Sequence, residues 1–343
     1  MKRALVVTDA WSPQTNGVVT TLQAVIEHLP ACGYGVDVVH PGAFSTMPLP
    51  SYPEIRLARN PWRVVDHIVS ARPDTVHIAT EGPLGLWARR FLSARGLPFT
   101  TSLHTKFPEY IEARTRLPRS LGYRFLRWFH APASATLCTT RSHVEELAGW
   151  GLEHLVVWGR GVDLARFRPR VTDSTGQRPR LLYVGRVAVE KNLEAFLRLP
   201  IDAQKVVVGD GPARADLERA YPDAIWLGYR HGAELVEQYR AADVFVFPSR
   251  TDTFGLVMLE AMACGTPVAA YPVTGPRDVV LEGVSGALDD DLSAAVTRAL
   301  AVDRGACRAY AEGHGWPAVA ARMVATFAPI EWDARATASA RWA

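Results

Sequence analysis

The feature that most constrains the fold of this chain is two consecutive series of short apolar runs. Each run is followed by a loop and by a longer stretch of helical character. In the first half the predicted strands are residues 4–8, 36–40, 75–79, 99–103 and 136–139. In the second half they are residues 181–184, 205–208, 224–227, 244–247 and 267–270. Apolar runs that alternate with helices are typical of parallel α/β sheets, since a parallel connection needs a crossover.

A polar stretch that contains Pro and Gly, residues 168–179, separates the two series. The chain has 343 residues, enough for two domains. We therefore expect two doubly wound, Rossmann-like domains facing each other, residues 1–165 and 166–315. Within residues 316–343, Val319, Met323 and Phe327 recur at a spacing of four and predict a last helix that packs back on the first domain. Ligands of such sheets bind beyond the carboxyl ends of the strands, so we expect the active site in the cleft between the domains.

Composition excludes several classes of protein. A formal net charge of +3 gives no case for a dedicated nucleic-acid binder. The longest apolar candidate, residues 256–271, is interrupted by Glu260 and Pro267, and the apolar run after the N-terminus is too short for a signal peptide. We therefore expect a cytoplasmic protein without a membrane span. The four cysteines have no metal-ligand spacing and are predicted to be free, buried thiols: Cys32, Cys138, Cys264 and Cys307.

Two glycine-containing loops have features of anion sites. Gly17 precedes a predicted helix, residues 20–29, where free backbone amides and the helix dipole favour an anion. The three spaced glycines of a dinucleotide site are absent, which argues against a dehydrogenase. In the second half, Gly185 follows a strand and is followed by Arg186 and Lys191. These two cations could converge on a diphosphate; the alternative is that both are solvated loop residues.

The segment of residues 247–268 is the most informative. Asp252 and Thr253 lie where they could cap a helix that begins near Gly255, whose free amides suit a phosphate. Glu260 lies inside this apolar helix, a costly position for a carboxylate unless hydroxyl or amide groups bind it, and a ribose would supply hydroxyls. The alternatives are a plain helix cap for Asp252 and a structural buried acid for Glu260.

These motifs resemble the retaining nucleotide-sugar glycosyltransferases of family 4, which have the two-domain α/β fold called GT-B. The family pattern is two acids separated by seven residues with Phe-Gly between them, then a helix that ends in a Gly-x-Pro turn. This chain has Asp252, where the family usually has Glu, and then Phe254-Gly255, Glu260 and Gly265-Thr266-Pro267. Further matches follow in order over nearly the whole chain: Asn16-Gly17, His104-Thr105, Gly161-Val162-Asp163 with Phe167, Gly185-Arg186 with Glu190-Lys191, and Gly209-Asp210-Gly211-Pro212.

The resemblance implies a nucleotide-sugar donor and a role for each matched residue. Arg186 and Lys191 would hold the diphosphate, Glu260 the ribose, and Gly17 a phosphate from the opposite domain. His104, at the carboxyl end of a strand, would bind a sugar hydroxyl or orient the acceptor. The donor sugar and the distal phosphate would be held by Asp252 and by the amides of Thr253, Phe254, Gly255 and Leu256. The nucleobase pocket would be lined by Tyr229 and Arg230.

No metal or other cofactor is expected. Cations and helix amides can stabilise the leaving diphosphate in a water-poor cleft. The acidic run of residues 289–291 precedes a helix and is predicted to cap it. The resemblance further implies retention by a front-side displacement, in which the departing phosphate oxygen takes the acceptor proton.

An arginine-rich segment bears on the acceptor. Residues 113–144 contain six Arg and no acid. On a helix, the apolar residues Leu121, Phe125, Trp128 and Phe129 would share one face, and the basic residues Arg119, Arg124 and Arg127 would point away from it. This pattern suits an anionic membrane surface; the alternative is an ordinary helix packed on its own sheet.

The stretch 104–110 also looks like the subgroup of lipid mannosyl-, glucuronosyl- and sulfoquinovosyltransferases. Together these features favour a lipid acceptor such as diacylglycerol and reversible docking on the inner leaflet of the cytoplasmic membrane. Three alternatives stay open: transfer to a soluble or polyprenyl-linked glycan, a nucleotide-sugar-binding regulator without turnover, and a sugar-nucleotide epimerase, which shares the fold.

Overall fold

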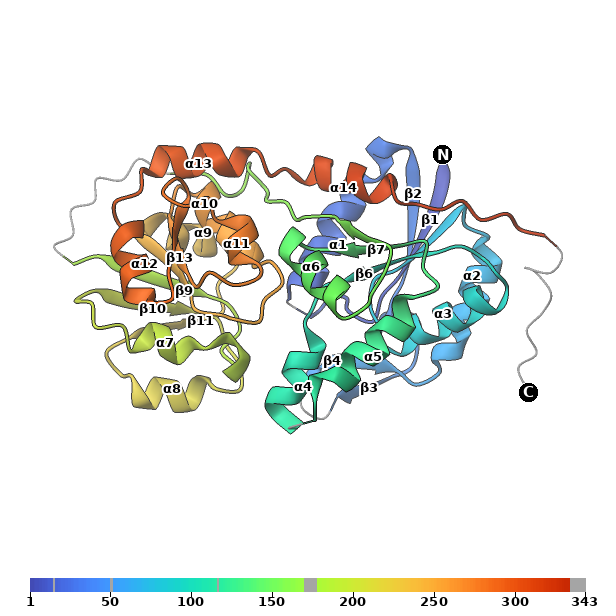
Figure 1. The fold of residues 1–343 in the computed structure, drawn as a ribbon, viewed down its shortest axis with the longest axis horizontal. Coiled ribbons are helices and arrows are strands. Elements are labelled where there is room, and N and C mark those ends of the chain that lie inside the picture. The colour runs from blue at the N-terminus through green and yellow to red at the C-terminus, as the bar shows by residue number, and fades with distance from the viewer. Residues whose placement is uncertain (15, 50–51, 116, 170–177, 334–343) are drawn as a thin grey trace. The chain divides into compact units, whose positions relative to one another are not determined.

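The computed structural model describes the chain except for residues 15, 50–51, 116, 170–177 and 334–343. It comprises two units, each built on a parallel six-stranded sheet (Figure 1). The first unit contains Met1–Pro108, Leu117–Gly159 and Trp316–Ala343. The second contains Glu109–Arg116 and Arg160–Gly315.

In the first unit the strand order is β2-β1-β5-β6-β7-β8. The strands are β1 (Lys2–Val7), β2 (Tyr34–Val39), β5 (Thr75–Ile78), β6 (Thr100–Leu103), β7 (Ala135–Cys138) and β8 (Leu155–Val157). A separate antiparallel pair consists of β3 (Thr46–Leu49) and β4 (Tyr52–Ala58). The helices are α1 (Gly17–His28), α2 (Val64–Ala71), α3 (Pro83–Ala94), α4 (Phe107–Thr115), α5 (Arg119–His130), α6 (Arg141–Gly149) and α14 (Trp316–Val324).

In the second unit the strand order is β11-β10-β9-β12-β13-β14. The strands are β9 (Arg180–Val184), β10 (Gln204–Val208), β11 (Ile225–Gly228), β12 (Val244–Phe247), β13 (Val268–Ala270) and β14 (Gly286–Leu288). The helices are α7 (Leu193–Leu197), α8 (Arg214–Ala220), α9 (Gly232–Ala241), α10 (Leu256–Ala263), α11 (Pro276–Val279), α12 (Leu292–Ala299) and α13 (Arg304–Glu312).

Both faces of the second sheet are covered, which explains why its strands read as continuous apolar runs. In β12, Phe245 and Phe247 pack with α9, α10 and α13, whereas Val244 and Val246 pack with α7 and α12. The order places β9, the first strand of the unit, beside β12, the fourth. This is the point where the chain reverses its direction across the sheet, and in open α/β sheets such a point leaves a crevice at the carboxyl ends of the two strands.

The ten predicted strands are present, with ends that differ by no more than two residues from the predicted ones. The sequence analysis missed β8, β14 and the β3–β4 pair. Helix α1 begins at Gly17, three residues before the predicted start, because the Asn16 side chain accepts hydrogen bonds from the amides of Val18 (3.0 Å) and Val19 (3.1 Å) and caps the helix. Asp291 caps α12 as predicted, with its carboxylate 2.9 Å from the Ser293 amide.

Helix α14 belongs to the first unit and packs against α1 (Figure 1). Val319 and Met323 are buried, and the ring of Phe327 meets that of Tyr34 edge to face at 5.2 Å. The indole N–H of Trp158 donates to the Val319 carbonyl at 3.0 Å. Val319 and Met323 therefore mark the buried side of this helix, whereas Phe327 lies beyond its end and is half-buried.

All four cysteines are free thiols, but the prediction that all are buried is wrong for one. Cys138, Cys264 and Cys307 are buried, and Cys32 is half-buried in the turn after α1. Burial raises the pKa of Cys264 and of Cys307 to about 12, so both stay protonated thiols at neutral pH.

Candidate functional site

The crevice between β9 and β12 holds an ion pair. Lys191 lies in the loop after β9 and Asp252 in the loop after β12, and the Lys191 Nζ is 2.5 Å from the Asp252 Oδ1. Both side chains are about four-fifths buried, with 20% and 18% exposed. The other carboxylate oxygen, Oδ2, is buried without a hydrogen-bond partner among the described residues. A polar ligand that entered the crevice would meet both charges.

Two further contacts hold these loops together. The Asn192 side-chain amide donates to the Pro248 carbonyl at 3.1 Å, and the Thr251 hydroxyl donates to the Glu190 carbonyl at 3.2 Å. Asn192 adopts a left-handed backbone (φ 53°), which directs the chain from the loop into α7. The two loops therefore form one structure, and the ion pair is part of it.

The prediction that Asp252 and Thr253 cap the following helix is wrong. Helix α10 begins at Leu256, its capping position is Gly255, and no side chain bonds there. Gly255 has a φ of 84°, and a Cβ atom on it would come within 2.9 Å of Phe247 and Met258. The backbone amides at the start of α10 therefore have no side-chain cap, and an anion site at a helix N-terminus requires such uncapped amides.

Glu260 lies inside α10, and its carboxylate accepts a hydrogen bond from the hydroxyl of Tyr239 on α9 at 2.8 Å. Burial raises the pKa of Glu260, while the Tyr239 hydroxyl and the positive charge of Arg166 oppose this rise. Burial and the nearby carboxylate together raise the pKa of Tyr239 well above its usual value. Tyr239, which the sequence analysis did not single out, thus satisfies one oxygen of an otherwise costly acid.

The remaining predicted donor residues line the same end of the second sheet. Tyr229 and Arg230 directly follow β11; Tyr229 is 52% exposed and stacks on His231 at 6.1 Å, and Arg230 pairs with Glu234 at 3.7 Å. Arg186 follows β9 and is half-buried. An exposed aromatic ring beside a cation could cover a nucleobase.

In the first unit the strand order reverses between β1 and β5, and a buried acid lies there. Asp9 follows β1; it accepts hydrogen bonds from the Thr80 hydroxyl (3.0 Å) and from the amides of Leu84 (2.9 Å) and Gly85 (3.3 Å) at the start of α3. Desolvation raises its pKa to about 6, against the effect of these hydrogen bonds. Gly17, predicted to contact a phosphate, lies further along this loop as the exposed first residue of α1.

His104 follows β6, next to β5 in the same sheet. Its Nε2 is 2.8 Å from the hydroxyl oxygen of Ser102, and its ring meets that of Trp158 edge to face at 5.8 Å. His104 is half-buried, and Ser102 and Trp158 are buried. The structure therefore places His104 at the carboxyl edge of the first sheet on a buried polar support.

Helix α5 differs from the prediction in one residue. Phe129 is fully buried in the core of the first unit and does not share a face with Leu121, Phe125 and Trp128, which are exposed. Tyr123 and Leu126 are also buried. The inner side of the helix therefore packs on the first unit, as the alternative hypothesis of an ordinary helix packed on its own sheet predicts. The outer side is apolar as well, and the side chains there are 39–52% exposed.

We call this outer side the α5 surface: the apolar residues Leu117, Leu121, Phe125 and Trp128 and the exposed cations Arg119, Arg124 and Arg127. Arg89 of α3 stabilises it, because its guanidinium lies 3.8 Å from the centre of the Trp128 ring and donates to the carbonyl oxygens of Trp128 and Phe129. Helix α5 thus has two apolar sides: one is buried in the first unit, and the other is exposed among the described residues.

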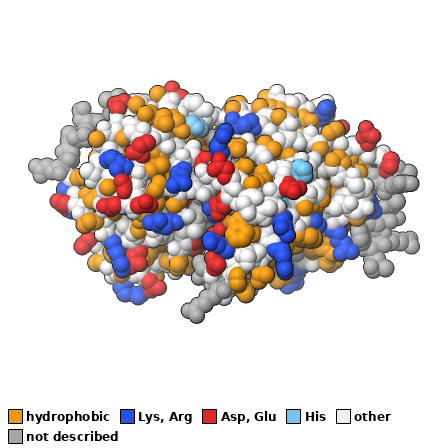
Figure 2. All heavy atoms as spheres, viewed as in Figure 1, with side chains coloured by type: hydrophobic (Ala, Val, Ile, Leu, Met, Phe, Trp, Pro, Cys, Tyr) orange, Lys and Arg blue, Asp and Glu red, His pale blue; other side chains and the backbone are white. Residues whose placement is uncertain are grey.

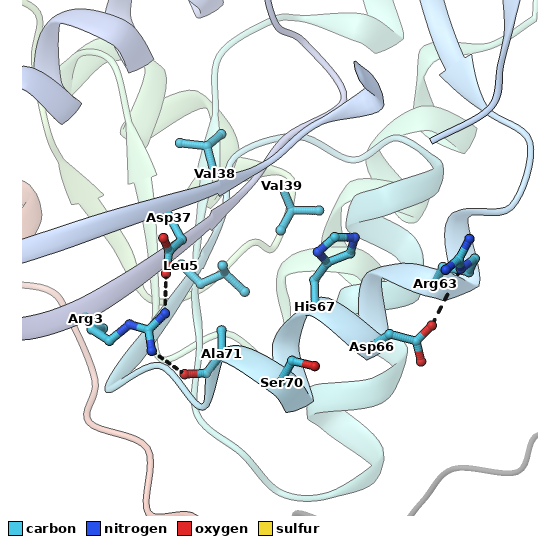
Figure 3. Close-up of a pocket in the computed structure, with 10 residues that line it drawn as sticks. All are labelled: Arg3, Leu5, Asp37, Val38, Val39, Arg63, Asp66, His67, Ser70 and Ala71. Carbon is cyan, nitrogen blue, oxygen red and sulfur yellow. Dashed lines mark hydrogen bonds and ion pairs between the residues drawn. The ribbon is translucent and has the colours of Figure 1, made fainter. Parts of the chain in front are cut away.

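A hollow of about 560 Å³ lies on the first unit, between α2 and strands β1 and β2 (Figure 3). Its charges pair with each other, Arg3 with Asp37 at 2.7 Å and Arg63 with Asp66 at 3.7 Å, and all four are more than half exposed. None of the predicted site residues lines this hollow. It has no buried polar group directed at a ligand, and we assign it no role.

Among the described residues, no group of three or more His, Cys, Asp or Glu could hold a metal ion. Within the same part of the chain, no helix is long and apolar enough to cross a bilayer. On the face shown in Figure 2, acidic and basic side chains are interspersed, as the small net charge leads one to expect.

Both halves of the chain match models of glycosyltransferase families. Residues 15–166 match the family model described as "Glycosyltransferase Family 4", and residues 178–302 match that described as "Glycosyl transferases group 1". A GDP-mannose-dependent alpha-mannosyltransferase of Mycolicibacterium smegmatis is 31% identical over 96% of this chain and 97% of its own. An alpha-monoglucosyldiacylglycerol synthase of Streptococcus pneumoniae is 28% identical over 85% of this chain and 77% of its own. The structure of a sucrose-phosphate synthase from Thermosynechococcus elongatus superposes with a TM-score of 0.77 at 21% identity, over 95% of this chain and 98% of that one.

Proposed function

The chain belongs to the glycosyltransferases of family 4 and has the GT-B fold, and on that basis we propose that it moves a hexosyl unit from a nucleotide-sugar to a membrane lipid. The observation that carries the proposal is the pair of charged loops at the β9–β12 crevice, together with a first unit that presents an apolar and cationic surface.

The donor would occupy the crevice of the second unit. Its diphosphate would meet Lys191 and Arg186, its ribose the carboxylate of Glu260, and its sugar the partnerless oxygen of Asp252. The uncapped amides at the start of α10 add a positive end to this side of the site. The mannosyltransferase relative is named for GDP-mannose, so GDP-mannose is the first donor to test, followed by UDP-linked hexoses.

The family resemblance implies transfer with retention. The carboxylate of Asp252 is paired with Lys191, and that of Glu260 is hydrogen-bonded to Tyr239, so a front-side displacement is favoured over a covalent intermediate on either acid. The departing phosphate oxygen would take the acceptor proton on the face from which the acceptor attacks. Lys191 and Arg186 would stabilise the negative charge that develops on the diphosphate, and His104 would orient a hydroxyl group.

The acceptor would be a glycerolipid of the diacylglycerol type, in line with the printed name of the synthase from Streptococcus pneumoniae. The α5 surface would bring the enzyme to this lipid, because exposed aromatic rings flanked by arginines insert at the boundary of an anionic leaflet. Each arginine there contributes about 1 kcal/mol, so three of them give reversible, salt-sensitive docking.

Vesicle sedimentation tests this docking, with lipid acceptor embedded in vesicles of phosphatidylglycerol and phosphatidylcholine. Replacement of Arg119, Arg124 and Arg127 by Gln should reduce sedimentation, and should reduce transfer to the embedded acceptor far more than transfer to a short-chain soluble analogue. As a control of equal charge change in the second unit, the exposed Arg178, Arg219 and Arg277 are replaced by Gln. An equal loss on both acceptors, or in both triple variants, would refute the membrane role.

Donor screening tests the reaction itself. Mass spectrometry of lipids from cells that express the chain should detect a new hexosylated glycerolipid. Nucleotide release that requires a water-soluble or polyprenyl-linked glycan would overturn the lipid acceptor. Conversion of the donor without any acceptor would indicate an epimerase, and absence of turnover with all acceptors would indicate a regulator.

A further inference from the structure

We propose that Lys106 and Glu146 are positioning residues, and that their buried ion pair holds the segment after β6, which begins with His104, against the inner side of α5. The inference rests on the proposed function in assigning His104 to the transfer reaction. The contacts that support it lie within the first unit. Lys106 and Glu146 would act through the place of His104 and not by touching the donor or the acceptor.

The ion pair joins two elements that are distant in the sequence. Lys106 lies in the loop after β6, two residues beyond His104, and Glu146 lies in α6. The Lys106 Nζ is 2.5 Å from the Glu146 Oε2, and the two side chains are 8% and 27% exposed. Separation of the pair would leave a largely buried charge without compensation, which is costly. The loop is therefore confined to arrangements that keep Lys106 beside its acid.

The backbone around Lys106 transmits this constraint to His104. The amide of Phe107 donates to the carbonyl oxygen of Thr105 at 2.9 Å, which closes a three-residue turn centred on Lys106. Thr105 moves with this turn and is covalently linked to His104. The histidine thus lies between the end of a buried strand and a turn whose central residue is held by the ion pair.

Helix α5 packs against the same region from its inner side. Leu103, the last residue of β6, lies in one buried apolar cluster with Tyr123 and Leu126 of α5. The Tyr123 hydroxyl oxygen also lies 3.4 Å from the Glu146 Oε1, a weak hydrogen bond. The helix therefore contacts both the strand that precedes His104 and the acid that holds Lys106.

The closest approach is between Gly122 of α5 and the buried Pro108, four residues beyond His104. A Cβ atom on Gly122 would lie 2.8 Å from the Pro108 side chain and 3.1 Å from its Cα. Glycine inside a helix is less favourable than alanine, and here its missing side chain leaves room for the passing chain. Residues 104–108 are thus held at two points, by the ion pair and by this contact.

This arrangement connects the two parts of the first unit that the proposed function uses. The outer side of α5 would dock at the lipid, and its inner side supports the segment of the histidine that would orient the acceptor. A buried ion pair often adds little net stability compared with apolar residues of similar volume. Its geometric requirement, that two charges stay together, is what a positioning role needs.

Hydrogen–deuterium exchange of the full-length protein, measured by mass spectrometry of its peptides, tests the placement without turnover. A peptide that spans residues 103–109 should exchange faster in Lys106→Met and in Glu146→Gln than in the wild type. The control is Arg3→Met, which breaks an ion pair with Asp37 at the amino end of β1, away from the carboxyl edge where His104 lies. It should leave the exchange of this peptide unchanged.

Kinetics give a second readout. Lys106→Met should lower kcat about 10- to 100-fold, the effect of a small displacement of an orienting group. The KM for donor should not change, because the donor crevice lies in the second unit, and the loss should be equal for vesicle-embedded and short-chain acceptors. The double variant Lys106→Met/Glu146→Gln should be no slower than Lys106→Met, because both changes break the same contact.

A second variant displaces the segment without changing a charge, and it serves if Lys106→Met fails to fold. Gly122→Ala adds the Cβ atom that must push Pro108 away. Alanine favours a helix more than glycine does, so a weaker α5 would not explain a loss of activity. The same faster exchange and the same fall in kcat are expected. Ser120→Ala, at an exposed position of the same helix, should change neither.

Unchanged exchange of residues 103–109 in both Lys106→Met and Gly122→Ala would overturn the proposal. So would losses of kcat that multiply in the double variant, or an equal loss of kcat in Arg3→Met. A protein that shows the predicted changes in exchange but transfers no sugar would refute the proposed function and leave the positioning role intact.

Discussion

Asp9 gives the first unit a pH-dependent stability whose size follows from the structure. Its carboxyl group is buried, and desolvation raises its pKa from 3.8 to about 6. A raised folded-state pKa means that the folded chain binds the proton more tightly than the unfolded chain does. The stabilising effect of this proton is fully present below the unfolded pKa and is lost as the pH rises through the folded value.

The magnitude follows from the two pKa values. With 3.8 unfolded and about 6 folded, the free energy of unfolding falls by about 3 kcal/mol over the whole titration and by about 2 kcal/mol between pH 4.5 and pH 7.5. Asp9→Asn places an uncharged group at the site and removes this contribution. The variant loses the oxygen that accepts from the Thr80 hydroxyl group and the Gly85 amide, and this loss lowers its stability at both ends of the pH range. The quantity to compare is therefore the change with pH, not the absolute stability.

Urea unfolding followed by tryptophan fluorescence reports mainly on the first unit, because Trp226 is the only tryptophan among the described residues that lies in the second unit. From pH 4.5 to 7.5, Asp9→Asn should gain about 2 kcal/mol relative to the wild type. Thr80→Val removes a hydrogen bond that lowers the pKa of Asp9, so it should move the transition to higher pH. Parallel pH profiles for the wild type and Asp9→Asn would refute the reasoning.

Further predictions concern the second unit. Lys191→Ala and Arg186→Ala should each cost about 2–4 kcal/mol in kcat/KM for donor, and unchanged steady-state rates in folded variants would disprove their contact with the diphosphate. Glu260→Ala should act mainly on donor KM. Tyr239→Phe removes a hydrogen bond that lowers the pKa of Glu260, so the pH below which donor KM rises should shift upward in a pH series of KM values. Arg308→Met leaves the carbonyl oxygens that its guanidinium contacts without a donor and should destabilise the unit by about 1–3 kcal/mol in urea unfolding. Treatment with a chelator should leave activity largely unchanged in the same assay.

Most strands of the two sheets could be predicted because their residues are largely buried on both faces and so form apolar runs. The signal fails at one edge of each sheet, where the strand has only three residues. Strand β8 has three residues, and Val156 and Val157 in it are exposed. Strand β14 has three residues that include Gly286, whose missing side chain leaves room for the Val268 backbone of the next strand. Neither run is long or apolar enough to be recognised.

The site could be predicted only where a motif fixes the local chain. The positions of Lys191 and Asp252 followed from their loops, whereas their pairing depends on which strands are neighbours, and strand order is not encoded locally. Tyr239 contacts Glu260, which is 21 residues away, and Ser102 contacts both His104 and His77, which are 2 and 25 residues away. One signal was present: His77 in β5 and residues 100–102 in β6 are polar residues in buried strands, and buried polar groups require partners.

Helix α5 shows why the pattern of charged and apolar residues in a sequence predicts only part of which side chains are exposed. Arg119, Arg124 and Arg127 were correctly assigned to the exposed side, since burial of an unpaired guanidinium is costly. The apolar residues could not be divided from sequence alone, because they surround more than one side of the helix. Contact with the sheet selects Phe129 for the core and leaves Phe125 outside.

The pairing of Asp252 with Lys191 bears on the proposed diphosphate site. A lone ammonium group that is four-fifths buried would lose hydration, which costs free energy. The carboxylate at 2.5 Å compensates this loss and holds the Lys191 ammonium group in place. A bound diphosphate would then add negative charge beside an ammonium group that is already in place, so little reorganisation would be needed. The shorter side chain of Asp, where the family usually has Glu, would keep the carboxylate close to its own loop, and its second oxygen, buried and without a partner, would be satisfied by a sugar hydroxyl group.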